Sequence, residues 1–99
     1  MGYRLTHKAA EDVREIYRAG FVRVGMRQAD AYHSLLEHTF RFIADNPFAA
    51  RQRLEISPPV RIHPVQAHLV IYQHQTDGEI LIIRVRHGHE DWMDPHTED

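Results

Sequence analysis

The sequence contains no cysteine among its 99 residues. Disulfide bonds and thiolate-bound metals are therefore excluded, which fits a protein of a reducing compartment. Packing alone must hold the fold together, and a chain of this length buries only about 60 to 65 % of its unfolded surface. We expect a single domain with a modest core, which a partner protein can extend.

The sequence also lacks a long apolar run. Its first residues, from Met1 to Thr6, are too few and too mixed in character to form the apolar part of a signal peptide. No later segment approaches the roughly 20 apolar residues that span a bilayer. The expected location is therefore the cytoplasm, without contact with a membrane.

Lysine is nearly absent, since Lys8 is the only one among the 12 lysine and arginine residues. Arginine suits bidentate contacts with carboxylate and phosphate groups, although arginine-rich codon usage explains the bias equally well. The formal net charge of -2 hides an uneven distribution, because basic residues occupy the body of the chain and acidic residues its end. The acidic residues at the end are Glu90, Asp91, Asp94, Glu98 and Asp99.

The first half of the chain predicts one short strand and two helices. Residues 3–5 have strand character, and the hydroxyl of Thr6 can cap a following helix by accepting a hydrogen bond from an amide of its first turn. Apolar residues then recur at steps of three and four, which predicts an amphipathic helix that ends at Gly25. A second helix with the same period runs from about Ala29 to Asn46-Pro47. So short a link requires the two helices to pack antiparallel.

The second half predicts three strands after an irregular surface connection over residues 48–59. The strands are expected at Val60 to Val65, Leu69 to Tyr72 and Ile80 to Ile83. Asp77-Gly78 predicts a tight turn between the last two, because this pair readily adopts positive backbone angles.

These elements predict an α+β fold in the order β-α-α-β-β-β. The two helices form a hairpin that packs on one face of a mainly antiparallel sheet. Residues 1–92 are expected to form this single domain, and residues 93–99 a flexible acidic tail.

Short motifs follow one another in a distinctive order along this fold. The first half carries Tyr3-Arg4-Leu5-Thr6, Asp12, Ile16-Tyr17, Gly25-x-x-Gln28-Ala29-x-x-Tyr32-x-x-x-Leu36 and Ile43-Ala44-Asp45-Asn46-Pro47. The second half carries His68-Leu69-Val70-Ile71-Tyr72 and Ile80-x-Ile82-x-Arg84-Val85-x-His87-Gly88. From Tyr3 to Trp92, their order and spacing resemble those of the ParE toxins of the RelE/ParE superfamily. Arg86 and His89-Glu90-Asp91-Trp92 depart from the family pattern.

The resemblance implies the toxin of a type II toxin–antitoxin system, which binds other proteins and is not an enzyme. It implies growth arrest by inhibition of DNA gyrase, and neutralisation by a ParD-like antitoxin in a hetero-oligomer such as a heterotetramer. DNA would be bound only through the antitoxin. Two alternatives stay open: a RelE-like endoribonuclease that cuts mRNA on the ribosome, and a non-toxic antitoxin-binding or regulatory module.

Aromatic and arginine side chains are the candidates for binding the antitoxin. The two helices carry more large apolar side chains than one sheet face covers, so a partner is expected to cover the remainder, although each is by itself a plausible core residue. An antitoxin can lay an amphipathic helix across the hairpin and add a strand to a sheet edge, and its acidic residues can pair with arginines. The candidate antitoxin-binding residues are Tyr17, Phe21, Arg23, Tyr32, Arg51, Arg53 and Arg61.

The end of the last strand supplies the candidates for binding the target, Arg84, Arg86, His87, His89 and Trp92. Alternation places Arg84 and Arg86 on one face and His87 on the other or at the strand end, so they do not converge as a ribonuclease site requires. Trp92 is typical of an interface anchor and equally of a side chain that holds the tail on the sheet. No metal or cofactor is expected, because His87 and His89 adjoin a frayed tail without fixed ligand geometry.

Overall fold

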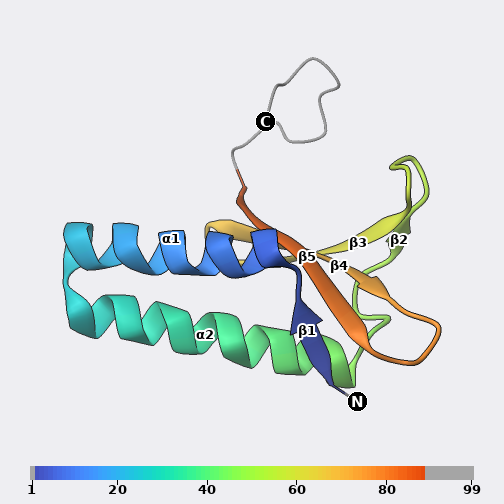
Figure 1. Ribbon diagram of the computed structural model, residues 1–99, viewed down its shortest axis with the longest axis horizontal. Coiled ribbons are helices and arrows are strands. Elements are labelled where there is room, and N and C mark those ends of the chain that lie inside the picture. The colour runs from blue at the N-terminus through green and yellow to red at the C-terminus, as the bar shows by residue number, and fades with distance from the viewer. Residues whose placement is uncertain (1, 89–99) are drawn as a thin grey trace.

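The computed structural model describes residues 2–88. Its helices are α1 (His7–Val24) and α2 (Met26–Asp45), and its strands are β1 (Tyr3–Leu5), β2 (Gln52–Arg53), β3 (Val60–Val65), β4 (His68–His74) and β5 (Ile80–His87). The helices form an antiparallel hairpin whose tip extends beyond the sheet (Figure 1). The end of the predicted domain 1–92 and the predicted tail 93–99 lie outside the described residues. Within residues 2–88, neither helix is long and apolar enough to cross a membrane.

Thr6 caps α1 as the sequence predicts. The amide of Ala9 donates a hydrogen bond to the Thr6 hydroxyl oxygen at 3.0 Å, which satisfies a donor of the first helical turn. The same hydroxyl donates to the carbonyl oxygen of Ile83 at 2.7 Å, and the Thr6 amide donates to the carbonyl oxygen of Ile82 at 3.0 Å. Thr6 therefore also ties the start of α1 to β5.

Gly25 is the only residue between the two helices. Its φ of 92° is a left-handed angle that favours glycine. Its amide donates to the carbonyl oxygen of Phe21 at 3.0 Å, and its carbonyl oxygen accepts from the amide of Ala29 at 3.1 Å. The predicted end of the first helix is confirmed, and α2 begins earlier than predicted, at Met26.

The sheet confirms the mainly antiparallel prediction. Its strand order is β1-β5-β4-β3-β2. β1 runs parallel to β5, and the three other neighbouring pairs are antiparallel. The predicted turn before β5 is present, because Gly78 has a φ of 89° and its amide donates to the carbonyl oxygen of Gln75 at 2.9 Å.

The prediction that residues 48–59 are irregular was wrong at one point. Gln52 and Arg53 pair with Arg61 and Val60 and form the edge strand β2. Two residues are too few to show the alternation by which a strand is recognised in a sequence.

A β-bulge in β5 decides which of its side chains face the helices. The register between β4 and β5 shifts by one residue, so that Ile83 is an extra residue in β5. Strict alternation would place Arg84 and Arg86 on the face of Ile82, toward the helices. The bulge places Val85 there instead, where it is buried in the core. The two arginines therefore lie on the opposite face of the strand.

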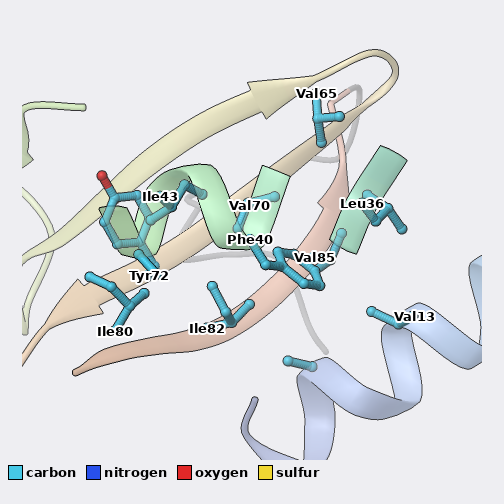
Figure 2. Close-up of a cluster of buried hydrophobic side chains, with 12 residues drawn as sticks. Val13, Leu36, Phe40, Ile43, Val65, Val70, Tyr72, Ile80, Ile82 and Val85 are labelled. Atoms are coloured by element: carbon cyan, nitrogen blue, oxygen red, sulfur yellow. The ribbon is translucent and has the colours of Figure 1, made fainter. Parts of the chain in front are cut away.

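The core lies between the sheet and α2, with a smaller contribution from α1 (Figure 2). α2 buries Leu36, Phe40 and Ile43, and the sheet meets them with apolar side chains of β3, β4 and β5. Tyr72 is fully buried, and its hydroxyl donates to the carbonyl oxygen of Pro47 at 2.9 Å. α1 buries only Ala9 and Val13, in its first half. The second half of α1 therefore makes little of the core.

Candidate interaction surfaces

A groove of about 560 Å³ lies on the helical hairpin. We call it the α1 groove, and its lining residues are Val13, Arg14, Tyr17, Arg18, Phe21 and His33. The ring of Tyr17 packs against those of Phe21 and His33, with centroid distances of 6.4 and 6.0 Å. Its hydroxyl donates to Oδ1 of Asp30 at 2.7 Å, and this hydrogen bond, more than burial, raises the pKa of Tyr17. Two of the predicted antitoxin-binding residues, Tyr17 and Phe21, thus form one aromatic surface.

The tip of the hairpin exposes apolar side chains. Val22 is 78 % exposed and Met26 60 %, and Phe21 and Val24 are each about half exposed, at 48 % and 52 %. Single exposed apolar residues are ordinary, whereas a contiguous patch marks an interaction site. The apolar tip is continuous with the α1 groove through Phe21, and the sheet does not reach it (Figure 1).

A second hollow, of about 420 Å³, lies among α1, α2 and the β3–β4 turn and borders the end of β5. We call it the hairpin cleft. Its lining combines apolar side chains, such as Ile16 and Leu36, with polar ones. The polar lining residues that had been predicted to bind a partner are Tyr17, Arg23, Tyr32 and His87. The cleft therefore brings together residues from both predicted binding sites.

Tyr32 and two histidines form a connected group in this cleft. The hydroxyl oxygen of Tyr32 lies 2.6 Å from Nδ1 of His68 and donates to the carbonyl oxygen of Val65 at 3.2 Å. The rings of His68 and His87 meet edge to face, with centroids 5.3 Å apart. Burial raises the pKa of Tyr32, and a backbone hydrogen bond with Ala67 opposes that shift. The neutral hydroxyl therefore links α2 to β4 and, through His68, to the end of β5.

Arg84 is held by Asp12 of α1. Its Nε and Nη2 donate to the two carboxylate oxygens of Asp12 at 2.8 and 3.0 Å. The amide of Val85 donates to the same carboxylate at 2.9 Å. The side chains are only 26 % and 16 % exposed, so this bidentate pair is partly shielded from water. Asp12 thus fixes both the side chain of Arg84 and the edge of β5.

A small hollow of about 220 Å³ adjoins this ion pair. Arg84, Arg86 and His87, three of the predicted target-binding residues, line it together with Asp12 and His68. The other two, His89 and Trp92, lie outside the described residues. The contact between Asp12 and Arg84 was not predicted, because only the fold brings these two residues together.

The remaining predicted antitoxin-binding residues lie elsewhere. Arg51, Arg53 and Arg61 are on or beside β2 and β3, far from the hairpin tip (Figure 1). Nη1 of Arg61 donates to the carbonyl oxygen of Ala50 at 2.7 Å, and its guanidinium lies over the ring of Phe48 at 5.1 Å. Arg53 pairs with a neighbouring glutamate at 3.5 Å. The seven predicted antitoxin-binding residues therefore form two groups and not one surface.

No metal site is apparent in residues 2–88, where no three histidine, aspartate or glutamate side chains gather around a common point.

Phe48 and Leu54 near β2 are 70 % and 73 % exposed. Neither residue stands out in the sequence, because both lie in the connection without a regular period.

The whole of this architecture has known relatives. A family model described as the ParE toxin of the type II toxin-antitoxin system, parDE, matches residues 3–92. The chain belongs to the ParE toxin family. It is 32 % identical over 89 residues to Toxin ParE1 from two strains of Mycobacterium tuberculosis, covering 90 % of this chain and 91 % of the relative. This confirms the predicted membership, and the chain is a ParE-type toxin of a type II toxin–antitoxin system.

A solved structure shows the same fold as this ParE-family toxin. It is titled the chromosomal ParDE TA system from P. aeruginosa and matches with a TM-score of 0.74 at 24 % identity. The match covers 88 % of this chain and 95 % of that chain. The hairpin and the sheet therefore belong to the ParE fold.

Proposed function

We propose that this ParE-family toxin acts in the cytoplasm, arrests growth by inhibiting DNA gyrase without catalysis, and is neutralised by a ParD-like antitoxin. The observation that carries the antitoxin part is the uncovered apolar surface of the helical hairpin. The structural relative from P. aeruginosa belongs to a ParDE system, which supports a partner of the ParD kind.

The hairpin suits an amphipathic helix of the antitoxin. The α1 groove offers the rings of Tyr17 and Phe21, and Arg14 and Arg18 also line it. A partner helix with apolar residues on one face and carboxylates beside them would match both features. The assembly is then a hetero-oligomer, for example a heterotetramer, and DNA is bound only through the antitoxin.

The end of β5 is the surface proposed for the target. Arg84, Arg86 and His87 line one hollow there, and arginine is well suited to bind carboxylates of a protein surface. The ion pair with Asp12 fixes the direction of Arg84, which lowers the entropy that binding must remove. These residues are proposed to bind gyrase and not to carry out chemistry.

A ribosome-dependent mRNA endoribonuclease is the second candidate. It is favoured by one observation, namely that His68 and His87 lie beside Arg84 and Arg86. Imidazole can act as a general acid or base, and guanidinium groups can stabilise a phosphorane-like transition state. The resemblance to the ParE branch favours gyrase over this alternative.

Induced expression of the chain alone in a bacterial host tests the proposal. We expect growth arrest, and we expect the purified protein to inhibit gyrase supercoiling while mRNA on ribosomes stays intact. The double variant Arg86→Ala with His87→Ala should abolish both effects. Arg41→Ala, an exposed arginine of α2, is the matched control and should retain them. Cleaved mRNA would support the second candidate, and absence of arrest would favour a non-toxic regulatory module.

A further inference from the structure

Three arginines near β2 belong neither to the helical hairpin nor to the end of β5. Of these, Arg61 borders a hollow of about 430 Å³, which we call the β2–β4 hollow. The hollow lies at the end of β4 where His74 pairs with Ile80, whereas His87 pairs with His68 at the other end of that strand. It is therefore separate from the surfaces proposed for the antitoxin and the target.

The polar lining of the hollow is neutral or basic. Arg61 supplies a guanidinium group, His74 an imidazole ring, and three glutamines supply amide groups. None of its lining residues in the described part of the chain is acidic, although the sequence contains 14 aspartate and glutamate residues. An anionic group in this hollow would therefore meet hydrogen-bond donors and no opposing carboxylate.

Two contacts hold the guanidinium group of Arg61 beside the hollow. Its Nη1 donates to the carbonyl oxygen of Ala50 at 2.7 Å, and the group lies over the ring of Phe48 at 5.1 Å. Within residues 2–88, Nη1 is the only nitrogen of this side chain that makes a hydrogen bond. The edge formed by Nε and Nη2 can therefore donate to a phosphate in the bidentate manner typical of arginine.

The loop that carries Phe48 is fixed on both sides of this residue. The hydroxyl of Tyr72 donates to the carbonyl oxygen of Pro47 at 2.9 Å, and Arg61 holds the carbonyl oxygen of Ala50. The Phe48 ring is 70 % exposed, so burial does not hold it in place. It contacts His74 edge to face, with ring centroids 5.2 Å apart. Both basic side chains of the hollow are thus oriented before a ligand binds, which lowers the entropy lost on binding.

The glutamines of the hollow offer a pattern that suits a nucleobase. Nε2 of Gln73 donates to the carbonyl oxygen of Pro59 at 3.3 Å, which leaves Oε1 as an acceptor. Oε1 of Gln75 accepts from Nη2 of Arg4 at 3.1 Å, which leaves its amide nitrogen as a donor. Adenine presents a donor, N6, beside an acceptor, N7. The volume of the hollow lies within the range of roughly 300 to 1,000 Å³ that is usual for small-molecule sites.

We propose that the β2–β4 hollow binds a nucleoside monophosphate. Its phosphate lies against Arg61 and His74, and its base is recognised by the amide groups of Gln73 and Gln75. Binding at this site requires neither the antitoxin nor the target. A free mononucleotide and the 5′-phosphorylated end of an RNA strand carry the same groups, so the test must distinguish these two sources.

Calorimetric titration of the purified protein with AMP, ribose 5-phosphate and adenosine provides the first test. AMP should bind at least tenfold more tightly than the other two compounds, because each of them lacks either the base or the phosphate. Absence of AMP binding at millimolar concentration, or equal affinities for AMP and ribose 5-phosphate, would overturn the inference. Tighter binding of a hexaglutamate peptide than of AMP would also overturn it, since the hollow would then suit an acidic protein segment.

The same titration with a 5′-phosphorylated RNA tetranucleotide identifies the source of the ligand. Tighter binding of AMP would support the free mononucleotide, and tighter binding of the tetranucleotide would support the end of an RNA strand. Both results would place a nucleoside monophosphate unit in the hollow, provided that the variants below weaken the binding.

Two variants separate the contributions of the phosphate and the base. Arg61→Lys keeps the positive charge but lacks the bidentate edge, so it should weaken AMP and ribose 5-phosphate binding alike, at least tenfold. Gln75→Leu should weaken AMP binding at least threefold and leave ribose 5-phosphate binding unchanged. Arg41→Ala, an exposed arginine of α2, is the matched control and should bind AMP as the unaltered protein does.

Thermal unfolding verifies that each variant is folded. Gln75 is only partly buried and follows the end of β4, so Gln75→Leu should fold even if Arg61→Lys does not. AMP affinity that is unchanged in the folded variants would overturn the inference.

Discussion

The two ends of the helical hairpin have the same apolar periodicity and opposite surroundings. At the sheet end, Ala9, Leu36 and Phe40 are buried against the strands, with exposures of 0 to 2 %. At the tip, Val22 and Met26 stay exposed, because no strand extends beneath them (Figure 1). The amphipathic pattern therefore identifies the apolar face of each helix. Whether that face is buried within this chain depends on how far the sheet extends beneath it.

The difference matters because apolar surface that the fold leaves open is available to a partner. The buried residues at the sheet end stabilise the folded toxin. The exposed apolar residues at the tip contribute little to the free energy of folding and stay in contact with water. Substitutions at the two ends should therefore separate stability from antitoxin binding.

The largest effect is expected for a matched pair of truncations. Leu36→Ala removes a fully buried side chain and should lower the free energy of unfolding by about 2 to 5 kcal/mol. Phe21→Ala at the tip, where the ring is 48 % exposed, should lower it by about 1 kcal/mol or less. Urea unfolding measures both values.

Antitoxin binding should show the reverse order for variants that remain folded. Phe21→Ala should weaken the complex, because it removes a ring from the α1 groove. Equal losses of stability in the two variants would mean that the tip is part of the core, and the distinction between the two ends would fail.

A second pair compares ion pairs of α1. Asp12→Ala removes the bidentate contact with Arg84 and leaves the amide of Val85 without that acceptor, so it should lower the free energy of unfolding by about 2 kcal/mol. Glu15→Ala removes a pair with Arg18 in which both side chains are more than two-thirds exposed, at 68 % and 69 %. Such a pair should contribute no measurable stability. Urea unfolding with a double-mutant cycle on Asp12 and Arg84 checks this, and an uncoupled pair would contradict it.

The sequence predicted the parts of the fold that repeat. The helical stripe, the Thr6 cap, Gly25 and the Asp77-Gly78 turn each follow from local chemistry, and each is present where expected. The resemblance to the ParE family could be recognised for the same reason, because the order and spacing of short motifs are read directly from the sequence.

The parts that were not predicted depend on residues far apart in the sequence. The bulge at Ile83 has no distinctive residue type, and β2 is too short to show a period. Asp12 and Arg84 are 72 residues apart, so only the packing of α1 on β5 reveals their contact. The hairpin cleft likewise arises from α1, α2 and the strand ends together. A site formed by several helices and strands can be recognised only when their arrangement in space is known.

Small effects of opposite sign are expected for two glycines near the tip. Gly20 is inside α1, and a Cβ built on it would lie 3.7 Å from that of Ala29, an ordinary contact. Gly20→Ala should therefore raise the free energy of unfolding by about 0.5 to 1 kcal/mol, because alanine restricts the unfolded chain and favours helix. A Cβ on Gly25 would meet nothing within 4 Å, yet its φ of 92° strains any other residue.

Gly25→Ala should accordingly lower the free energy of unfolding by about 1 to 2 kcal/mol although no atom is in its way. Thermal unfolding resolves both changes, since 1 kcal/mol corresponds to about 4 to 8 °C in Tm for a domain of this size. A destabilising effect of Gly20→Ala would mean that the two helices near the tip pack as tightly as they do above the sheet. The tip would then have no room for an added methyl group, contrary to the prediction. The expected opposite signs would show that the tip has free space and that only its backbone angle at Gly25 is fixed.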